Sequence, residues 1–95
     1  MIQHIVLLRW KSDASAEAIR AVTAQFSRLR DVAGVSDLTH GENFAKQNDG
    51  YSYALTARIR DNDALKAYWS DPTHKAIMAM MTSILERALV IDFNL

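Results

Sequence analysis

The chain contains no cysteine, only one proline and only three glycines among its 95 residues. Without cysteine it can form no disulfide, hold no metal through a thiolate and use no thiol as a nucleophile. Its 11 basic and 11 acidic side chains cancel, and no basic stripe is present, which argues against nucleic acid as a partner. No apolar run is long enough to cross a bilayer, and the start lacks the charged region of a secretory signal. We therefore expect a cytoplasmic protein that binds neither nucleic acid nor membrane.

A chain of 95 residues is predicted to fold as one domain, residues 1–95, with a modest core. Hydrophobic periodicity, capping residues and turn residues divide it in the order β-α-β-β-α-β, with the second helical region split in two. This order predicts an α+β fold, a ferredoxin-like sandwich in which a four-stranded antiparallel sheet carries helices on one face. The expected elements are strands at 2–10, 35–44, 51–59 and 89–95, a helix through 19–29 that ends by Gly34, a short helix at 61–68, and a last helix that starts at Asp71-Pro72 and buries Ile77, Met80, Met81, Ile84 and Leu85.

The first predicted strand is apolar on both faces. Val6 and Leu8 lie on one face of an extended segment, and Ile5 and Leu7 lie on the other. A strand with two apolar faces belongs in a sheet that is covered on both sides. Since the helices are expected on one face only, we predict that a second copy of the chain covers the other, giving a homodimer through the sheet.

The stretch Tyr68-Trp69-Ser70-Asp71-Pro72-Thr73-His74 places a phenol and an imidazole on either side of the only proline. Asp71 suits a helix N-cap and Pro72 the first helical position, so His74 falls in the first turn of a new helix. The partial positive charge of that helix end favours a neutral imidazole, which can act as a general base. Tyr68 could then donate a hydrogen bond to a developing oxyanion. Packing and capping are equally compatible roles for these residues, and the sequence leaves both open.

Other polar and aromatic residues are weaker candidates. His4 lies among apolar residues and serves either as a core group or as part of a ligand cavity, which Trp69 and the methionines of the last helix could also line. Asn43 could bind a ligand or fix a loop. His40 is expected at a solvent-facing or rim position. The three histidines lack metal-ligand spacing, so no metal site and no cofactor are predicted.

Four short motifs occur in order along the chain: His4-x-Val6, Gly41-x-Asn43, Ala64-Leu65-x-x-Tyr68-x-x-x-Pro72-x-His74 and Val90-x-Asp92-Phe93. Together they resemble the stress-responsive dimeric α+β barrel (Dabb) domain, and the resemblance covers essentially the whole chain. It implies a ferredoxin-like protomer whose sheet packs against that of a second copy, forming a barrel flanked by helices.

The resemblance also implies a choice of functions. Many members of this family are known only as stress-associated proteins. One plant branch resembles a polyketide cyclase, in which a Tyr and a His drive an aldol condensation without metal or organic cofactor. The matching positions are Tyr68 and His74, and His4 matches a further pocket histidine. The chain departs from the family at Asp71, where the common residue is His, and this alters the charge beside the pair.

We therefore expect a homodimeric Dabb-type protein with a pocket between sheet and helices for a small apolar or carbonyl-containing ligand. The alternative is a cofactor-free cyclase or lyase of polyketide-like carbonyl compounds that uses Tyr68 and His74. A related monooxygenase acting on phenols is a third possibility, for which the chain carries no matching motif. A cavity on which Tyr68 and His74 converge favours the enzyme, whereas a space filled by Met or Trp side chains favours simple packing.

Overall fold

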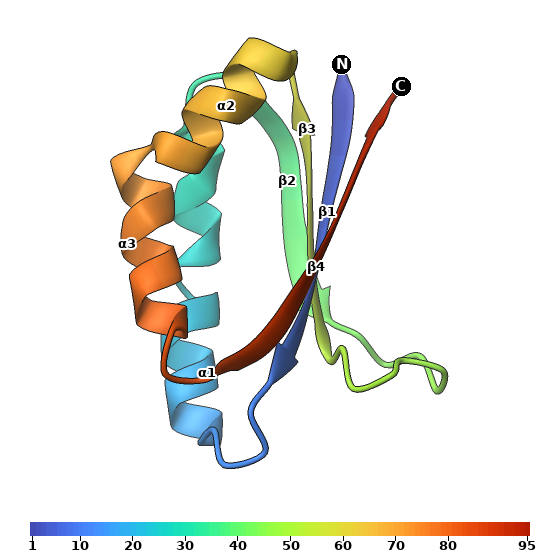
Figure 1. Cartoon of the computed structure of the whole chain (residues 1–95), viewed down its shortest axis with the longest axis vertical. Coiled ribbons are helices and arrows are strands. Elements are labelled where there is room, and N and C mark those ends of the chain that lie inside the picture. The colour runs from blue at the N-terminus through green and yellow to red at the C-terminus, as the bar shows by residue number, and fades with distance from the viewer.

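The computed structural model describes residues 1–95 as an α+β sandwich (Figure 1). The strands and helices follow one another along the chain as β1 (Ile2–Trp10), α1 (Ala16–Thr23), the 3-10 helix η1 (Phe26–Asp31), β2 (Val35–Glu42), β3 (Tyr53–Ile59), α2 (Asn62–Ser70), α3 (Pro72–Met81) and β4 (Leu85–Asn94). The four strands form one sheet in the order β2-β3-β1-β4, and every neighbouring pair is antiparallel. The predicted ferredoxin-like fold is confirmed.

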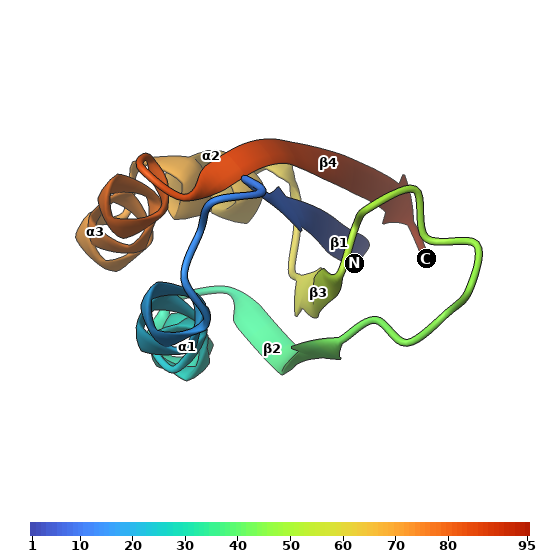
Figure 2. The ribbon, with the colours of Figure 1, turned by 90° about the horizontal axis from the view of Figure 1, so that it is seen from below.

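All helices cover one face of the sheet, as the two perpendicular views show (Figures 1 and 2). The core lies between the helices and this inner face, where Leu8, Leu55 and Ile59 of the sheet are almost fully buried. Phe26 of η1 and Ile77 of α3 close the core from the helix side. None of the helices is both long and apolar enough to cross a membrane.

The opposite face of the sheet carries an exposed apolar surface. In β4, the side chains of Leu89, Ile91 and Phe93 are 40 to 48% exposed. In the register of the sheet, Leu89 pairs with Leu7 and Ile91 pairs with Ile5 on β1. Because directly opposed residues share a face of a sheet, these five side chains form one apolar group, which we call the outer face.

Side-chain caps fix the starts of α1 and α2. Ser15 accepts a hydrogen bond from the Ala18 amide at the start of α1, and Asp61 accepts one from the Ala64 amide at the start of α2. Each bond satisfies one of the four free amides at a helix start, which typically stabilises the helix by about 1 kcal/mol. The caps therefore set where the helices begin over the sheet.

The structure corrects three expectations about the helices. The helix predicted through residues 19–29 is two helices, because α1 ends at Thr23 and the chain continues as the 3-10 helix η1. In η1 the side chains three residues apart eclipse one another, which turns both Phe26 and Leu29 into the core. Met80, predicted to be buried, is 44% exposed.

The third correction concerns the residues after α3. This helix ends at Met81, so Ile84 and Leu85 lie beyond it. Leu85 begins β4, which starts four residues earlier than the predicted strand at 89–95. The additional pairing extends β4 along nearly all of β1, since Leu85 lies opposite Trp10.

Candidate functional site

The corner between α2 and α3 brings Tyr68 and His74 together. Asp71 has an extended backbone and its carboxylate accepts a hydrogen bond of 2.8 Å from the Thr73 amide, while Pro72 occupies the first turn of α3. Pro72 cannot continue the hydrogen-bond ladder of α2, so the chain turns here. The ring centroids of Tyr68 and His74 are 4.6 Å apart as a result.

His4 and Trp69 complete a group of four rings around this corner. His4 reaches up from the inner face of β1, with its ring centroid 5.4 Å from that of Tyr68 and 5.7 Å from that of Trp69. Trp69 lies 5.0 Å from His74. Three of the four are buried, with exposed fractions of 0% for His4, 2% for Tyr68 and 7% for His74, whereas Trp69 is 40% exposed. We call these four residues the ring cluster.

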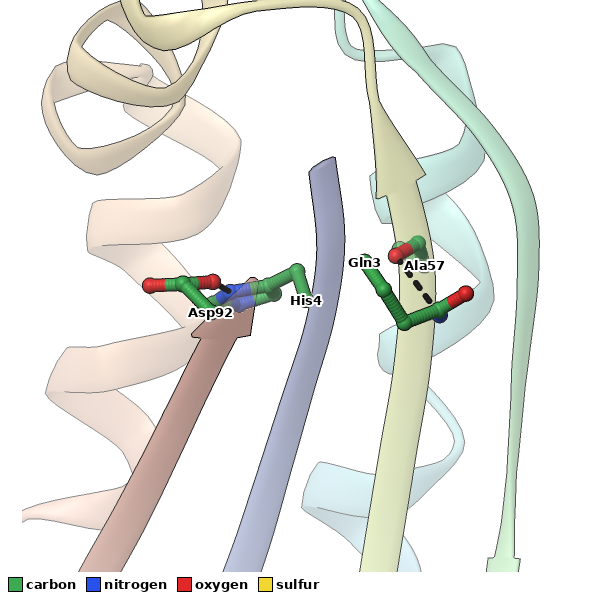
Figure 3. Close-up of polar contacts among 4 residues, drawn as sticks. All are labelled: Gln3, His4, Ala57 and Asp92. Atoms are coloured by element: carbon green, nitrogen blue, oxygen red, sulfur yellow. Dashed lines mark hydrogen bonds and ion pairs between the residues drawn. The ribbon is translucent and has the colours of Figure 1, made fainter. Parts of the chain in front are cut away.

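Asp92 of β4 holds His4 in place. The Nδ1 atom of His4 and the Oδ1 atom of Asp92 are 2.5 Å apart, and Figure 3 shows the two side chains meeting between β1 and β4. His4 and Asp92 are direct partners in the sheet register. A carboxylate oxygen accepts the hydrogen bond, so Nδ1 of His4 carries a proton.

Two imidazole nitrogens within the ring cluster have no hydrogen-bond partner. They are Nε2 of His4 and Nδ1 of His74, and both are buried. Most buried polar atoms in proteins are paired, and an unpaired one costs about 1 to 3 kcal/mol. The cluster therefore retains hydrogen-bonding capacity that the protein itself does not use.

Burial also tunes the acid–base properties of the pair. Desolvation lowers the pKa of His74 below its ordinary value of 6.5, and the neighbouring His4 charge lowers it further. Desolvation raises the pKa of Tyr68 to about 12, with a further contribution from the Asp92 charge. Near neutral pH, His74 is thus an uncharged imidazole able to accept a proton, and Tyr68 keeps its hydroxyl proton.

A cavity of about 70 Å³ lies beside the ring cluster, between α3 and the inner face of the sheet. Of its 13 lining residues, 12 are hydrophobic, and the exception is His74. Tyr68 and Trp69 also line it, while His4 lies behind them. The space between the Tyr68–His74 pair and the sheet is therefore an open cavity and is not filled by other side chains. No group of three or more metal-ligating side chains occurs in the chain.

Asn43 lies away from the ring cluster. Its side-chain amide donates to the carbonyl of Tyr51 at 2.7 Å, and its side-chain oxygen accepts from the Ala45 amide at 3.0 Å. Both contacts fix the loop between β2 and β3. Asn43 does line a separate hollow of about 360 Å³ beside α1, but it does not share the cavity of Tyr68 and His74.

His40 is half-buried, which fits the rim position among the two that were expected. Its Nδ1 lies 2.7 Å from the hydroxyl of Tyr53 and its Nε2 lies 3.0 Å from the hydroxyl of Ser27. Desolvation, followed by the charge of Arg30, lowers the pKa of His40. The inner face of β2 receives η1, and this packing covers the ring.

The sequence profile of the stress-responsive A/B barrel domain matches residues 2–95. The chain belongs to this family. An uncharacterised protein of Streptomyces coelicolor is 31% identical over 84 residues, covering 84% of this chain and 86% of the relative.

Two solved structures show the same fold. One is a dimeric ferredoxin-like protein of unknown function from Thermobifida fusca, 24% identical, with a TM-score of 0.87 over 99% of this chain and 90% of that one. The other is a hydroxynitrile lyase from Passiflora edulis, 18% identical, with a TM-score of 0.84 over 97% of this chain and 90% of that one.

Proposed function

We propose that this A/B barrel protein binds a small, largely apolar compound that carries a hydrogen-bonding oxygen, such as a carbonyl or hydroxyl group. The observation that carries this proposal is the free Nδ1 of His74, a buried nitrogen on a residue that lines a largely apolar cavity. A ligand oxygen that can donate or accept would satisfy this nitrogen, and the apolar remainder would displace water from the walls.

The size and shape of the cavity limit the ligand. Ligand pockets for drug-sized molecules typically exceed about 300 Å³, whereas this cavity measures about 70 Å³. A compound of a few heavy atoms is the best match for the enclosed part. Trp69 and Met78 line the cavity and are 40% and 39% exposed. The end of a longer ligand would therefore extend into solvent between these two side chains.

Filling the cavity tests the binding proposal. Ala88 lines the cavity from β4, so Ala88→Leu should weaken binding of small aldehydes and ketones by at least about 10-fold, because the added atoms occupy the ligand space. Ligand-detected NMR against a panel of such compounds, each paired with a hydrocarbon of equal size, measures the effect. Each oxygenated compound should bind about 5- to 10-fold more tightly than its hydrocarbon, the usual worth of one hydrogen bond.

The matched control is Ala79→Leu, because Ala79 is exposed on α3 and does not line the cavity. It should leave every affinity unchanged. If ketones and hydrocarbons bind with equal affinity, the free imidazole nitrogen does not contact the ligand. If Ala88→Leu binds as tightly as wild type, the ligand binds outside this cavity.

The protein is further proposed to act as a homodimer that buries the outer face. Leu89, Ile91 and Phe93 are too exposed for an apolar sheet surface that faces water, and the Thermobifida fusca neighbour of the same fold is described as dimeric. Packing two outer faces together would cover both copies and leave the two cavities open on the helix side.

A second candidate function is cofactor-free proton transfer at a carbonyl or hydroxynitrile substrate. His74 would take a proton from the carbon beside a carbonyl, and Tyr68 would donate a hydrogen bond to the carbonyl oxygen as it gains the enolate charge. With a hydroxynitrile, His74 would take the hydroxyl proton as the C–CN bond breaks, so that the hydroxyl oxygen becomes a carbonyl oxygen and the electron pair leaves with cyanide. Asp92 and His4 would support the pair from behind. The lowered pKa of His74 and the raised pKa of Tyr68 favour this candidate, as does the similarity in fold to a hydroxynitrile lyase.

A further inference from the structure

We propose that Phe44 is a preformed anchor of the dimer: the loop between β2 and β3 of each protomer carries this ring onto the outer face of its partner. The inference rests on the proposed homodimer and adds the side chain that secures it. The side chain of Phe44 is 99% exposed, more than any other large hydrophobic residue of the chain.

The loop that carries Phe44 is tightly hydrogen-bonded. Asn43 bonds across the loop base, from its main-chain amide to Ser52 and from its side chain to Tyr51. Asn48 bonds back to the Ala45 carbonyl at 3.0 Å and forward to the Gly50 amide at 2.9 Å. The main chain that carries the ring therefore loses little conformational freedom on binding, which lowers the entropic cost of using Phe44 as an interface anchor.

Arg9 fixes the loop relative to the outer face. Arg9 lies on the outer side of β1, where its Nε forms an ion pair of 3.3 Å with Glu86 of β4. The same guanidinium donates to the Asp49 carbonyl at 3.3 Å and lies 5.3 Å from the ring centroid of Tyr51. One side chain thus joins the loop to both strands that carry the outer face.

This attachment has a close steric fit at Gly50. Gly50 has φ of +80°, and a Cβ atom there would lie 2.7 Å from Cδ of Arg9. Only glycine combines this backbone conformation with that approach. The loop and Arg9 are therefore packed as a unit, and this unit carries the exposed Phe44.

A second copy of this chain is the occupant that fits best. The loop lies on the side of the sheet away from the helices in both views (Figures 1 and 2), which is the side of the outer face. The chain has no net charge, so two copies approach without overall repulsion. In a two-fold dimer each outer face receives the partner's loop, so every Phe44 contact occurs twice.

Phe44→Ala tests the assignment in the full-length protein. The substitution should raise the dimer dissociation constant by about 30-fold or more in sedimentation equilibrium, since two aromatic anchors are lost per dimer. The unfolding midpoint of the monomer, measured at high dilution, should not change because the ring is 99% exposed. Met80→Ala, which removes an exposed side chain on the helix side, should leave the dissociation constant unchanged.

A cross-linking measurement locates the contact independently. Benzoylphenylalanine in place of Phe44 should give a photo-cross-linked dimer whose junction maps to β1 or β4 of the other copy. The same residue in place of Met80 should give none. Junctions confined to the helices would overturn the assignment even if the dimer is weakened by Phe44→Ala.

Ile91→Asp separates failure of this inference from failure of the homodimer proposal. If Ile91→Asp yields monomers while Phe44→Ala binds within 2-fold of wild type, the sheet dimer holds and Phe44 is not its anchor. If both variants remain dimers of wild-type affinity, the outer face is not the interface, and both proposals fail. Both proposals also fail if the wild-type protein is a monomer at high micromolar concentration.

Discussion

Replacing His74 with glutamine is expected to lower any carbonyl or hydroxynitrile turnover by about 10²- to 10⁴-fold, the usual contribution of a positioned general base. Glutamine keeps a similar size and a hydrogen-bonding side chain but cannot take the proton. Tyr68→Phe should cost about 10²- to 10³-fold, the usual effect of losing one donor to a developing oxyanion. Deuterium exchange beside the carbonyl and release of cyanide from small hydroxynitriles measure the two reactions.

The pH profile provides an internal check on the same base. Because burial lowers the pKa of His74 below 6.5, the wild-type rate should stay flat as the pH falls through 6.5 and decline only at lower pH. The control is Met80→Ala, which changes an exposed side chain of α3 and should retain the wild-type rate and profile. If His74→Gln reacts at the wild-type rate, His74 is not the general base and the ring cluster serves only to bind the ligand.

Alkaline unfolding is expected to depend on Tyr68 more than on the other tyrosines. Its pKa is raised from 10.0 to about 12 in the folded protein, so folding is favoured by the neutral phenol. The contribution is fully present below pH 10 and is lost as the pH rises toward 12, and a shift of this size corresponds to about 3 kcal/mol. Tyr68→Phe should remove most of this pH dependence because phenylalanine has no proton to lose.

Urea unfolding between pH 8 and 12 measures the difference between wild type and Tyr68→Phe. Tyr51→Phe is the matched control and should retain the wild-type decline. Absorbance of tyrosinate should show that one of the three tyrosines ionises only when the protein unfolds. Parallel curves for wild type and Tyr68→Phe would mean that water reaches the Tyr68 hydroxyl in solution.

Local sequence patterns were sufficient to predict most of the fold. The alternation in residues 2–10 predicted a strand with two apolar faces, and the structure places Leu8 in the core and Ile5 on the outer face. The Asp71-Pro72 pair predicted the helix corner because a cap and a proline act within one turn of chain. Such signals depend only on neighbouring residues, so they are readable without the tertiary structure.

The contacts of the site could not be predicted in the same way. His4 and Asp92 are 88 residues apart in sequence and meet only because β1 and β4 are neighbours in one particular register. One signal was available: Asp92 is the single acid on the inner side of an otherwise apolar alternation that includes Ala88 and Val90. The covering of His40 likewise depends on η1, in which the three-residue spacing of Phe26 and Leu29 fits an α-helix as well as a 3-10 helix.

The alternation of β4 has a consequence for how the length of this strand can vary. Asp92 faces the ring cluster while its neighbours Ile91 and Phe93 face outward. A side-chain period of two means that inserting or deleting one residue ahead of them would reverse every following position. The carboxylate would then lie on the outer face, where we propose that a second copy packs, and a hydrocarbon side chain would replace it behind His4. Single-residue length changes in β4 should therefore disable ligand binding and assembly together, whereas changes by two residues preserve the facing of both sets.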